Sequence, residues 1–439
     1  MRIGFAADAA EGTALYLTRA IDRLAGKAVP LAKASYRQPV IRLAAGYRRL
    51  LRGTCFIGIT GSVGKTTTKD LAYRALATRF RTVRSHLSNN DLYNTARTIL
   101  STPPGTAFCL QELGVDTPGS LDAPLELLRP NLAIVTTIGL DHYRIFRTRE
   151  AVAAEKTQLV RALDTQGTAV LNADDPHVEA MADACAGRVL RYGRAAHADL
   201  RILAVETNWP DGLALQLQWQ QGPPARVATA LHGEHLATSL AAAITTAIAA
   251  GLSLEAACAA LQGVEPTTGR LSLARSSDGI LWLRDDFKTS QWSVGQAFEY
   301  LASCRQGVAR RVIVLGTVAD RRGKSRDAYS KVLAQAAGRA ELVVMVGEHS
   351  HYAADVAHRH PDTELRGFAT PEAAARWLQS VLRPGDLVLL KGGMKDHLSR
   401  LLLARDRPVA CWPTRCERMI DCSHCALLAV PTRHDGSAA

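Results

Sequence analysis

The sequence predicts an α/β protein made of two tandem units, each a mostly parallel sheet covered by helices. From residue 55 onward, short apolar runs rich in β-formers alternate with helical stretches, as strands and crossover helices do in a parallel sheet. A glycine-rich turn joins the first of these strands to the helix after it. The alternation starts again near residue 266, which indicates a second unit with a cleft between the two.

The first unit mixes buried strands with a region of different character. Its buried strands are predicted at 55–60, 107–114, 131–139 and 168–173. Residues 199–230 alternate apolar and polar side chains around a turn at Trp209–Gly212, which predicts an inserted β-hairpin. Residues 233–262 are rich in alanine and predict helix.

The second unit shows the same alternation of strands and helices. Strands are predicted at 280–287, 311–317, 341–347 and 386–393, and helices at 293–305, 325–338 and 371–382. Together with the ends of the chain, this gives four segments. We expect a basic helical segment at 1–52, a first domain at 53–265, a second domain at 266–405 and a cysteine-rich tail at 406–439.

The N-terminal segment concentrates positive charge. The chain carries 53 Lys and Arg against 41 Asp and Glu, a net charge of +12, and residues 1–52 hold ten basic and three acidic side chains. Residues 13–52 have helical spacing with Pro30 and Pro39 as expected breaks. The charge favours an anionic surface or polymer as partner, and a solvated helix face is the alternative. We expect no nucleic-acid partner.

The chain shows no signal for a membrane span or for secretion. It contains no apolar run of the roughly 18 residues that a transmembrane helix needs. The first residues lack a basic stretch followed by an apolar core, so we expect a cytoplasmic protein.

The turn after the first strand has the composition of a phosphate-binding loop. Glycines at 58, 61 and 64 are followed by Lys65 and a threonine run. Glycine lets backbone N–H groups turn toward phosphate oxygens, the lysine reaches the terminal phosphates, and a threonine hydroxyl binds Mg²⁺. The candidate nucleotide-binding residues in this loop are Gly61, Ser62, Gly64, Lys65, Thr66 and Thr67.

From this loop onward, over residues 54–395, the chain resembles the Mur ligases. The loop TGSVGKTTTK, the motif HLSNNDLYN, the strand end LQELG and the stretch RPNLAIVTTIGLDHYRIFRTREAVAAEK follow one another in the family's order. The resemblance implies a P-loop ATPase domain with a parallel sheet, followed by a Rossmann-like α/β domain. It also implies ATP and Mg²⁺, with magnesium held by Thr66, Glu112, His142 and Lys156, the last as a carbamate.

The resemblance assigns roles to further residues. Lys65, Lys156, His142 and Glu112 take the catalytic positions. The nucleotide-binding positions outside the loop are Asn89, Asn90, Asn172, Arg270 and Asp285. Two cations at such a site neutralise the charge that spreads over a transferring phosphoryl group.

The sequence departs from the family mainly where the amine substrate is bound. In the stretch LRDDFKTSQWS, Lys288 and Ser290 stand where the family has asparagine, and in LLKGGMKDHL, Gly393 and Met394 replace Ser and Arg. About 50 residues precede the first strand, fewer than the family's UDP-binding domain. We therefore expect a different acid substrate, either a glycan, a peptide or a protein.

Three functions remain open. The first is an ATP-dependent ligase that joins a carboxylate to an amino acid or other amine through an acyl phosphate. The second is the cell-wall step that joins UDP-N-acetylmuramoyl-tripeptide to D-alanyl-D-alanine. The third is a nucleotide-binding scaffold without ligase activity.

The tail holds four cysteines within fifteen residues, at Cys411, Cys416, Cys422 and Cys425. Four thiolates at such spacing predict a tetrahedral Zn²⁺ site, with an iron–sulfur cluster as a weaker option. The alternative is reduced cysteines with a role in interactions.

Overall fold

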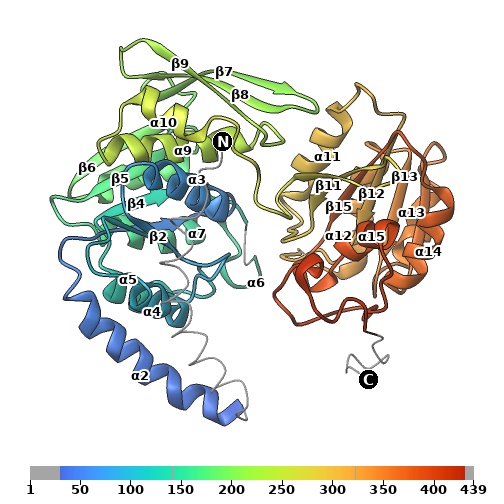
Figure 1. Ribbon diagram of the computed structural model, residues 1–439, viewed down its shortest axis with the longest axis horizontal. Helices are drawn as coiled ribbons and strands as arrows, with labels where there is room; N and C mark the ends of the chain where they lie inside the picture. The colour runs from blue at the N-terminus through green and yellow to red at the C-terminus, as the bar shows by residue number, and fades with distance from the viewer. Residues whose placement is uncertain (1–29, 141–142, 322, 431–439) are drawn as a thin grey trace.

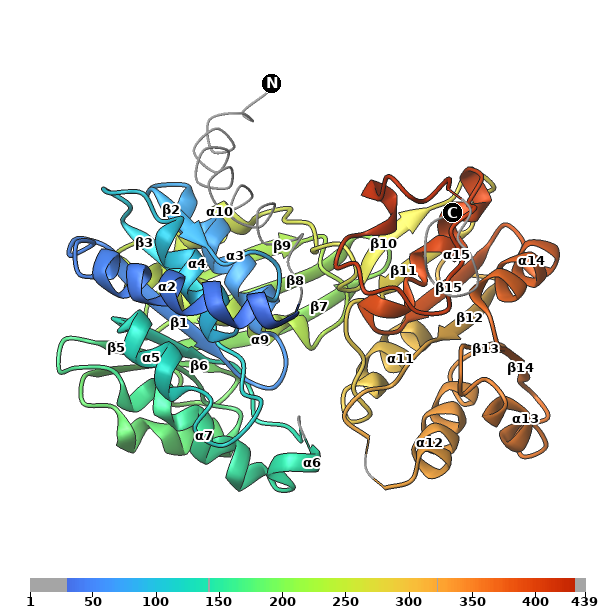
Figure 2. The same ribbon diagram turned by 90° about the horizontal axis from the view of Figure 1, so that it is seen from below.

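The computed structural model describes residues 30–140, 143–321 and 323–430, and it shows two bodies side by side (Figures 1 and 2). Each body is built on its own sheet, as the sequence predicts. In the described residues the first sheet has nine strands in the order β2-β3-β1-β4-β5-β6-β7-β8-β9, and the second has six in the order β10-β11-β15-β12-β13-β14. The α/β fold class is therefore confirmed.

The strands of the first sheet are β1 (Cys55–Thr60), β2 (Thr82–Arg84), β3 (Phe108–Glu112), β4 (Leu132–Val135), β5 (Thr168–Asn172), β6 (Arg188–Gly193), β7 (Leu200–Asn208), β8 (Gly212–Trp219) and β9 (Pro224–Thr229). Its helices are α2 (Pro30–Arg48), α3 (Lys65–Ala77), α4 (Leu92–Leu100), α5 (Asp122–Leu128), α6 (Tyr143–Phe146), α7 (Arg149–Arg161), α8 (Pro176–Glu179), η1 (Ala180–Ala184), α9 (Leu236–Ala249) and α10 (Leu254–Leu261).

The central strand β1 lies at a switch in the strand order. It pairs in parallel with β3 on one side and with β4 on the other, so the chain leaves β1 toward one edge and returns on the opposite side. The register sets Ile59 beside Glu112 and Thr60 beside Val135, so the carboxyl ends of the three strands lie together. Ligands of open α/β sheets bind at such a point.

The predicted hairpin at 199–230 is present, with its turn at residues 209–211, so that Gly212 already begins β8. β7 and β8 pair antiparallel, and β9 adds a third antiparallel strand, so the region continues the main sheet instead of standing apart from it. In Figure 1 these strands extend along the top of the first body toward the second.

The second sheet consists of β10 (Ser272–Arg275), β11 (Leu281–Asp285), β12 (Arg310–Leu315), β13 (Leu342–Val346), β14 (Glu364–Phe368) and β15 (Asp386–Lys391). Its helices are α11 (Val294–Ser303), α12 (Ser325–Ala337), α13 (Tyr352–Ala357), α14 (Pro371–Val381), η2 (Met394–Asp396), α15 (Ser399–Asp406) and η3 (Cys422–His424). The register of β11 with β15 sets Asp285 directly beside Lys391 at the carboxyl ends of both strands.

The prediction that Pro39 breaks the N-terminal helix is wrong, because α2 runs through it from Pro30 to Arg48. The helix packs on α4 and α5, with Ala44 fully buried in the core of the first body. That packing offsets the hydrogen bond that proline removes. Residues 13–29 of the predicted helix lie outside the described residues. No helix in the described ranges combines the length and apolarity needed to cross a bilayer.

Candidate functional site

The phosphate-binding loop lies between the end of β1 and the start of α3. Gly61 and Gly64 have φ angles of 140° and 82°, a region that favours glycine. A Cβ on Gly61 would lie 1.9 Å from Thr136 Oγ1, and one on Gly64 would lie 2.9 Å from Ser239 Oγ. Both glycines are therefore required by backbone conformation and by close approach, which leaves a cradle with the N-terminus of α3 at its base.

Hydrogen bonds to the neighbouring strand end hold this loop in place. The Ser62 N–H donates to Thr137 O at 2.8 Å, and the Gly139 N–H donates to Ser62 Oγ at 2.8 Å. Lys65 Nζ donates to Gly61 O at 2.5 Å, so the lysine side chain folds back over the loop. In this position the ammonium group is available to anionic oxygens in the cradle.

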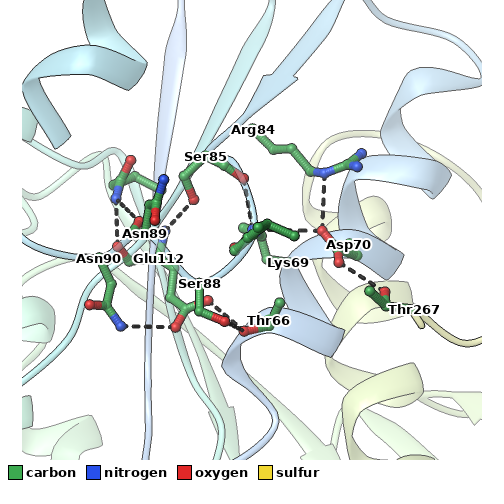
Figure 3. Close-up of polar contacts among 12 residues, drawn as sticks. Thr66, Lys69, Asp70, Arg84, Ser85, Ser88, Asn89, Asn90, Glu112 and Thr267 are labelled. Atoms are coloured by element: carbon green, nitrogen blue, oxygen red, sulfur yellow. Dashed lines mark hydrogen bonds and ion pairs between the residues drawn. The ribbon is translucent and has the colours of Figure 1, made fainter. Parts of the chain in front are cut away.

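A cluster of oxygen and nitrogen groups surrounds Thr66, the second residue of α3 (Figure 3). Thr66 Oγ1 donates to Glu112 Oε2 at 2.8 Å and lies 3.0 Å from Ser88 Oγ. Asn90 Nδ2 donates to Glu112 Oε1 at 3.1 Å, and Arg270 Nη2 donates to Ser88 Oγ at 3.2 Å. Residues that are far apart in sequence therefore gather at the carboxyl ends of β1 and β3.

A buried lysine supports the loop that carries part of this cluster. Lys69 is fully buried, and its Nζ donates to Ser85 O at 2.7 Å and to Leu87 O. Burial lowers the Lys69 pKa, and the adjacent Asp70 carboxylate opposes that shift. Asp70 in turn accepts a hydrogen bond from Thr267 Oγ1 at 3.1 Å. The network ties α3 to the loop that carries Ser88 and to the segment just before Arg270 (Figure 3).

The cluster opens into a cavity of about 350 Å³ that both bodies line. Its far wall carries Asp285 and Lys391, whose Oδ2 and Nζ atoms are 2.6 Å apart. Lys391 Nζ also donates to Lys288 O at 3.1 Å, and Trp292 packs over Gly139 of the first body. One cavity therefore joins the phosphate cradle to the strand ends of the second sheet.

Nine of the predicted site residues line this cavity: Ser62, Gly64, Lys65, Thr66, Thr67, Asn90, Glu112, Arg270 and Asp285. Gly61 and Asn89 do not line the cavity. Gly61 packs against Thr136, and the Asn89 carbonyl accepts a hydrogen bond from Gln111 Nε2 at 3.2 Å. Asn172 lies outside the lining. Its amide donates to Thr136 O at 2.9 Å and accepts from the Asp174 N–H at 3.0 Å, so it links the ends of β4 and β5.

Two of the predicted catalytic residues are not placed at the cavity. Lys156 is 1% exposed on α7 and lies outside the cavity lining. Its neighbour Glu155 caps the turn before α5 by accepting from the Gly119 N–H at 2.9 Å. His142 lies outside the described residues. The roles of Lys156 and His142 therefore stay predictions.

Sequence reasoning missed Ser88, Lys69 and Trp292. Ser88 precedes Asn89 inside the motif that the resemblance uses, and its position beside Thr66 and Arg270 follows from the loop conformation at Leu87, whose φ is 47°. Lys69 follows Lys65 by one helical turn, a spacing that could have placed both on one face. Trp292 had no sequence signal, since its contact crosses between the bodies.

The residues at the cradle fit a nucleotide with Mg²⁺. The Thr66 hydroxyl and the Glu112 carboxylate are hard oxygen donors beside the cradle, and Mg²⁺ keeps several of its ligands as water and phosphate oxygens. The described residues contain no group of three or more His, Cys, Asp and Glu side chains arranged for a metal ion.

The tail cysteines converge without forming such a group. All four line a cavity of about 100 Å³ together with His397 and Arg400. The Cys422 thiol is 3.1 Å from His397 Nδ1, and burial raises the Cys422 pKa to about 12, with the nearby Arg400 opposing that shift. The zinc prediction has no support from the structure, and the iron–sulfur alternative has none either.

Comparison with known proteins agrees with the fold and with the site. Residues 59–247 match the Mur ligase middle domain, and residues 269–394 match the Mur ligase glutamate ligase domain. The UDP-N-acetylmuramoyl-tripeptide–D-alanyl-D-alanine ligase of Mycobacterium tuberculosis (strain ATCC 25618 / H37Rv) is 30% identical over 360 residues, which cover 77% of this chain and 70% of that protein.

A relative with a different amine in its name has the same percentage identity. The UDP-N-acetylmuramoylalanine–D-glutamate ligase of Anaeromyxobacter dehalogenans (strain 2CP-C) is 30% identical over 359 residues, covering 80% of this chain and 72% of that protein. A crystal structure of MurF from Acinetobacter baumannii superposes with a TM-score of 0.76 at 24% identity, covering 84% and 80% of the two chains, and shows the shared fold. The phosphate cradle, the Thr66–Glu112 cluster and both domain matches show that this chain belongs to the Mur ligase family, whose members form amide bonds with ATP.

Proposed function

We propose that this ligase activates a carboxylate as an acyl phosphate in the cavity between its two bodies and transfers the acyl group to an amine that itself carries an anionic group. The observation that carries the proposal is the shared cavity of about 350 Å³. Lys65, Thr66 and Glu112 lie on its nucleotide wall, and Lys288 and Lys391 lie on the opposite wall.

The proposed reaction runs in two steps. A carboxylate oxygen of the acid attacks the γ-phosphorus of ATP, the bond to the β-phosphate oxygen breaks, and ADP leaves. The ammonium of the second substrate first gives up one proton to solvent. The neutral amine nitrogen then attacks the acyl carbon, the carbon–oxygen bond to phosphate breaks, and the departing phosphate takes the second proton. Lys65 and Arg270 would hold the phosphate oxygens in line for the first step. Bound Mg²⁺, held by Thr66 and Glu112, would supply neutralisation of phosphate charge.

The acceptor wall supports an anionic amine substrate. Lys288 is exposed to the cavity, and Lys391 reaches it from the end of β15 beside Asp285. The ammonium groups of both lysines would attract a carboxylate on the amine, while Asp285 would attract the amine's own positive charge. This arrangement favours an amino acid or a short peptide over an uncharged amine.

The test is ADP release by the full chain with a panel of acids and amines, UDP-N-acetylmuramoyl-tripeptide and D-alanyl-D-alanine among them. ADP release should depend on both an acid and an amine, and Lys65→Ala should abolish it. Retention of full ADP release by Lys65→Ala would show the assignment of the loop to be wrong. ATP binding without turnover across the whole panel would favour the scaffold alternative.

A second candidate is the reaction named for the Mycobacterium tuberculosis relative, the joining of UDP-N-acetylmuramoyl-tripeptide to D-alanyl-D-alanine. The 30% identity over 360 residues favours it. Turnover with that pair, at a rate above that of other acids and amines in the panel, would select this candidate. As ATP and such precursors are cytoplasmic metabolites, the proposed place of action in either case is the cytoplasm.

The basic N-terminal segment supports a proposed contact with an anionic surface. Residues 30–52 contain six basic and no acidic side chains. Leu43 and Leu50 are 64% and 76% exposed beside the exposed Arg42 and Arg49. Apolar side chains among cations suit the interface of an anionic membrane. Cosedimentation with phosphatidylglycerol vesicles but not with phosphatidylcholine vesicles, weakened in the double variant Arg42→Glu/Arg49→Glu, is the expected result.

A further inference from the structure

The tail docks on the second body beside its acceptor wall. The cysteine tail, defined here as residues 407–430, runs next to the loop 392–397 that follows β15. The Cys416 N–H donates to Lys395 O at 2.9 Å, and the exposed Glu417 pairs with Lys395 Nζ. The tail therefore touches the loop in which Gly393 and Met394 replace the family's Ser and Arg.

A buried arginine joins the tail to this loop. Arg400 is 1% exposed, and its guanidinium donates to carbonyl oxygens on both segments. In the loop it reaches Asp396 O at 3.0 Å and His397 O at 3.1 Å. In the tail it reaches Cys411 O at 3.0 Å and Pro413 O at 2.8 Å. Four charge-assisted hydrogen bonds from this buried arginine fix the tail and the loop relative to each other.

A second link runs from the tail to β11. Arg284 Nη2 is 2.6 Å from Asp421 Oδ2 in the tail and 3.1 Å from Asp286 Oδ2. The Arg284 and Asp286 side chains are 10% and 4% exposed, so this ion-pair triad is largely removed from water. The tail therefore supplies Arg284 with a second carboxylate.

Both links end next to residues that line the cavity. Arg284 precedes Asp285 on β11, and the Met394 N–H of the loop donates to Phe287 O at 3.0 Å. Phe287 and Asp285 line the cavity, as does Lys391, the residue from which the loop starts. A displacement of the tail would therefore shift residues of the acceptor wall before it shifted those of the phosphate cradle.

We propose that the cysteine tail is a positioning element of the acceptor site, in which Asp421 acts through Arg284 to hold β11 and the loop 392–397 in register for the amine. The inference rests on the proposed function for its kinetic consequence. No residue of the tail lines the cavity, so its effect should fall on amine binding and leave ATP binding unchanged.

The test compares the full-length protein with Asp421→Asn, which removes the charge and keeps the shape. Hydrogen exchange followed by mass spectrometry should show amides at 287–293 and 392–397 exchanging about tenfold faster, as expected for loss of one buried charge-assisted hydrogen bond. Amides at 61–69 should be unchanged. With the acid and amine that support turnover, the KM for the amine should rise about tenfold and the KM for ATP should stay the same.

Two further variants define the controls. Glu417→Gln removes a carboxylate of the same tail whose side chain is 70% exposed, and it should behave as the parent protein does. Asp421→Glu keeps the charge and should restore most of the protection. Equal exchange at 287–293 in Asp421→Asn and Glu417→Gln would overturn the inference, and so would equal loosening of 61–69. Absence of turnover in the parent protein would count against the proposed function alone, since the exchange result stands without it.

Discussion

The nucleotide wall and the acceptor wall of the cavity are both formed at the ends of neighbouring parallel strands. The residues at these strand ends resemble the Mur ligase motifs more closely on the nucleotide wall than on the acceptor wall. On the nucleotide wall, Thr66 and Glu112 keep the family's residues and lie 2.8 Å apart between side-chain oxygens. On the acceptor wall, Lys288 stands where the family has asparagine, and a tail that lies beyond the matched domains contacts Arg284 beside this wall.

The difference follows from what each wall has to bind. Phosphates and Mg²⁺ require backbone N–H groups, a cation and hard oxygen donors at fixed positions, so few substitutions preserve the geometry. An amine substrate is recognised by side chains on a mixed set of elements, and these can change together with the substrate. Relatives at 30% identity carry the names of different amines, which agrees with that freedom.

The largest effect is expected on the nucleotide wall. Glu112→Gln removes the negative charge that faces the Thr66 hydroxyl beside the cradle, and kcat/KM for ADP release should fall about 1,000-fold because a magnesium ligand is weakened. Unfolding temperature should change little. Glu299→Gln, which alters an exposed ion pair with Arg339, is the matched control. A loss of less than tenfold would remove Glu112 from the magnesium site.

The free energy of unfolding should depend on pH through a buried histidine at the contact between the two bodies. His232 Nδ1 lies 2.9 Å from the Tyr300 hydroxyl of the second body, and burial lowers the His232 pKa from 6.5 to about 4. The unfolded chain then binds a proton that the folded chain does not, so the free energy of unfolding falls as pH drops from 6.5 toward 4, by about 3 kcal/mol in total.

Chemical unfolding at several pH values between 4 and 7 measures this slope. His232→Gln should flatten it, whereas His358→Gln, at an exposed position, should leave it as in the parent. An unchanged slope in His232→Gln would place the proton uptake elsewhere.

The sequence predicted the contiguous parts of the molecule well. The strands and helices around the cradle, and nine site residues that line the cavity, follow from local patterns and from motif order. Contacts between distant segments had no such signal. Arg284 and Asp421 are 137 residues apart, and nothing in either neighbourhood indicates the pair. Pro39 shows the reverse case, in which a clear local signal is overridden by packing of α2 on α4 and α5.

A smaller effect is expected from closing the phosphate cradle. Gly61→Ala places a Cβ 1.9 Å from Thr136 Oγ1 at a φ of 140°, so the loop has to move. We expect ADP affinity, measured by calorimetry, to fall about 30-fold, or roughly 2 kcal/mol. Gly46→Ala, at a helical position with open space around the added carbon, should keep full affinity. Equal affinity in both variants would mean that the loop does not contact the nucleotide.

The smallest predicted effect separates the two walls most directly. Lys288 lines the acceptor side of the cavity with an exposed side chain. Lys288→Ala should raise the KM for a carboxylate-bearing amine about fivefold, the value of roughly 1 kcal/mol for a solvent-screened charge contact, and leave the KM for ATP unchanged. Because the contact is electrostatic, the difference between parent and variant should shrink at high salt. Lys331→Ala, a change on α12 outside the cavity lining, should alter neither constant. If Lys288→Ala instead raised the KM for ATP, Lys288 would belong to the nucleotide wall, and the division between the two walls would not hold at that residue.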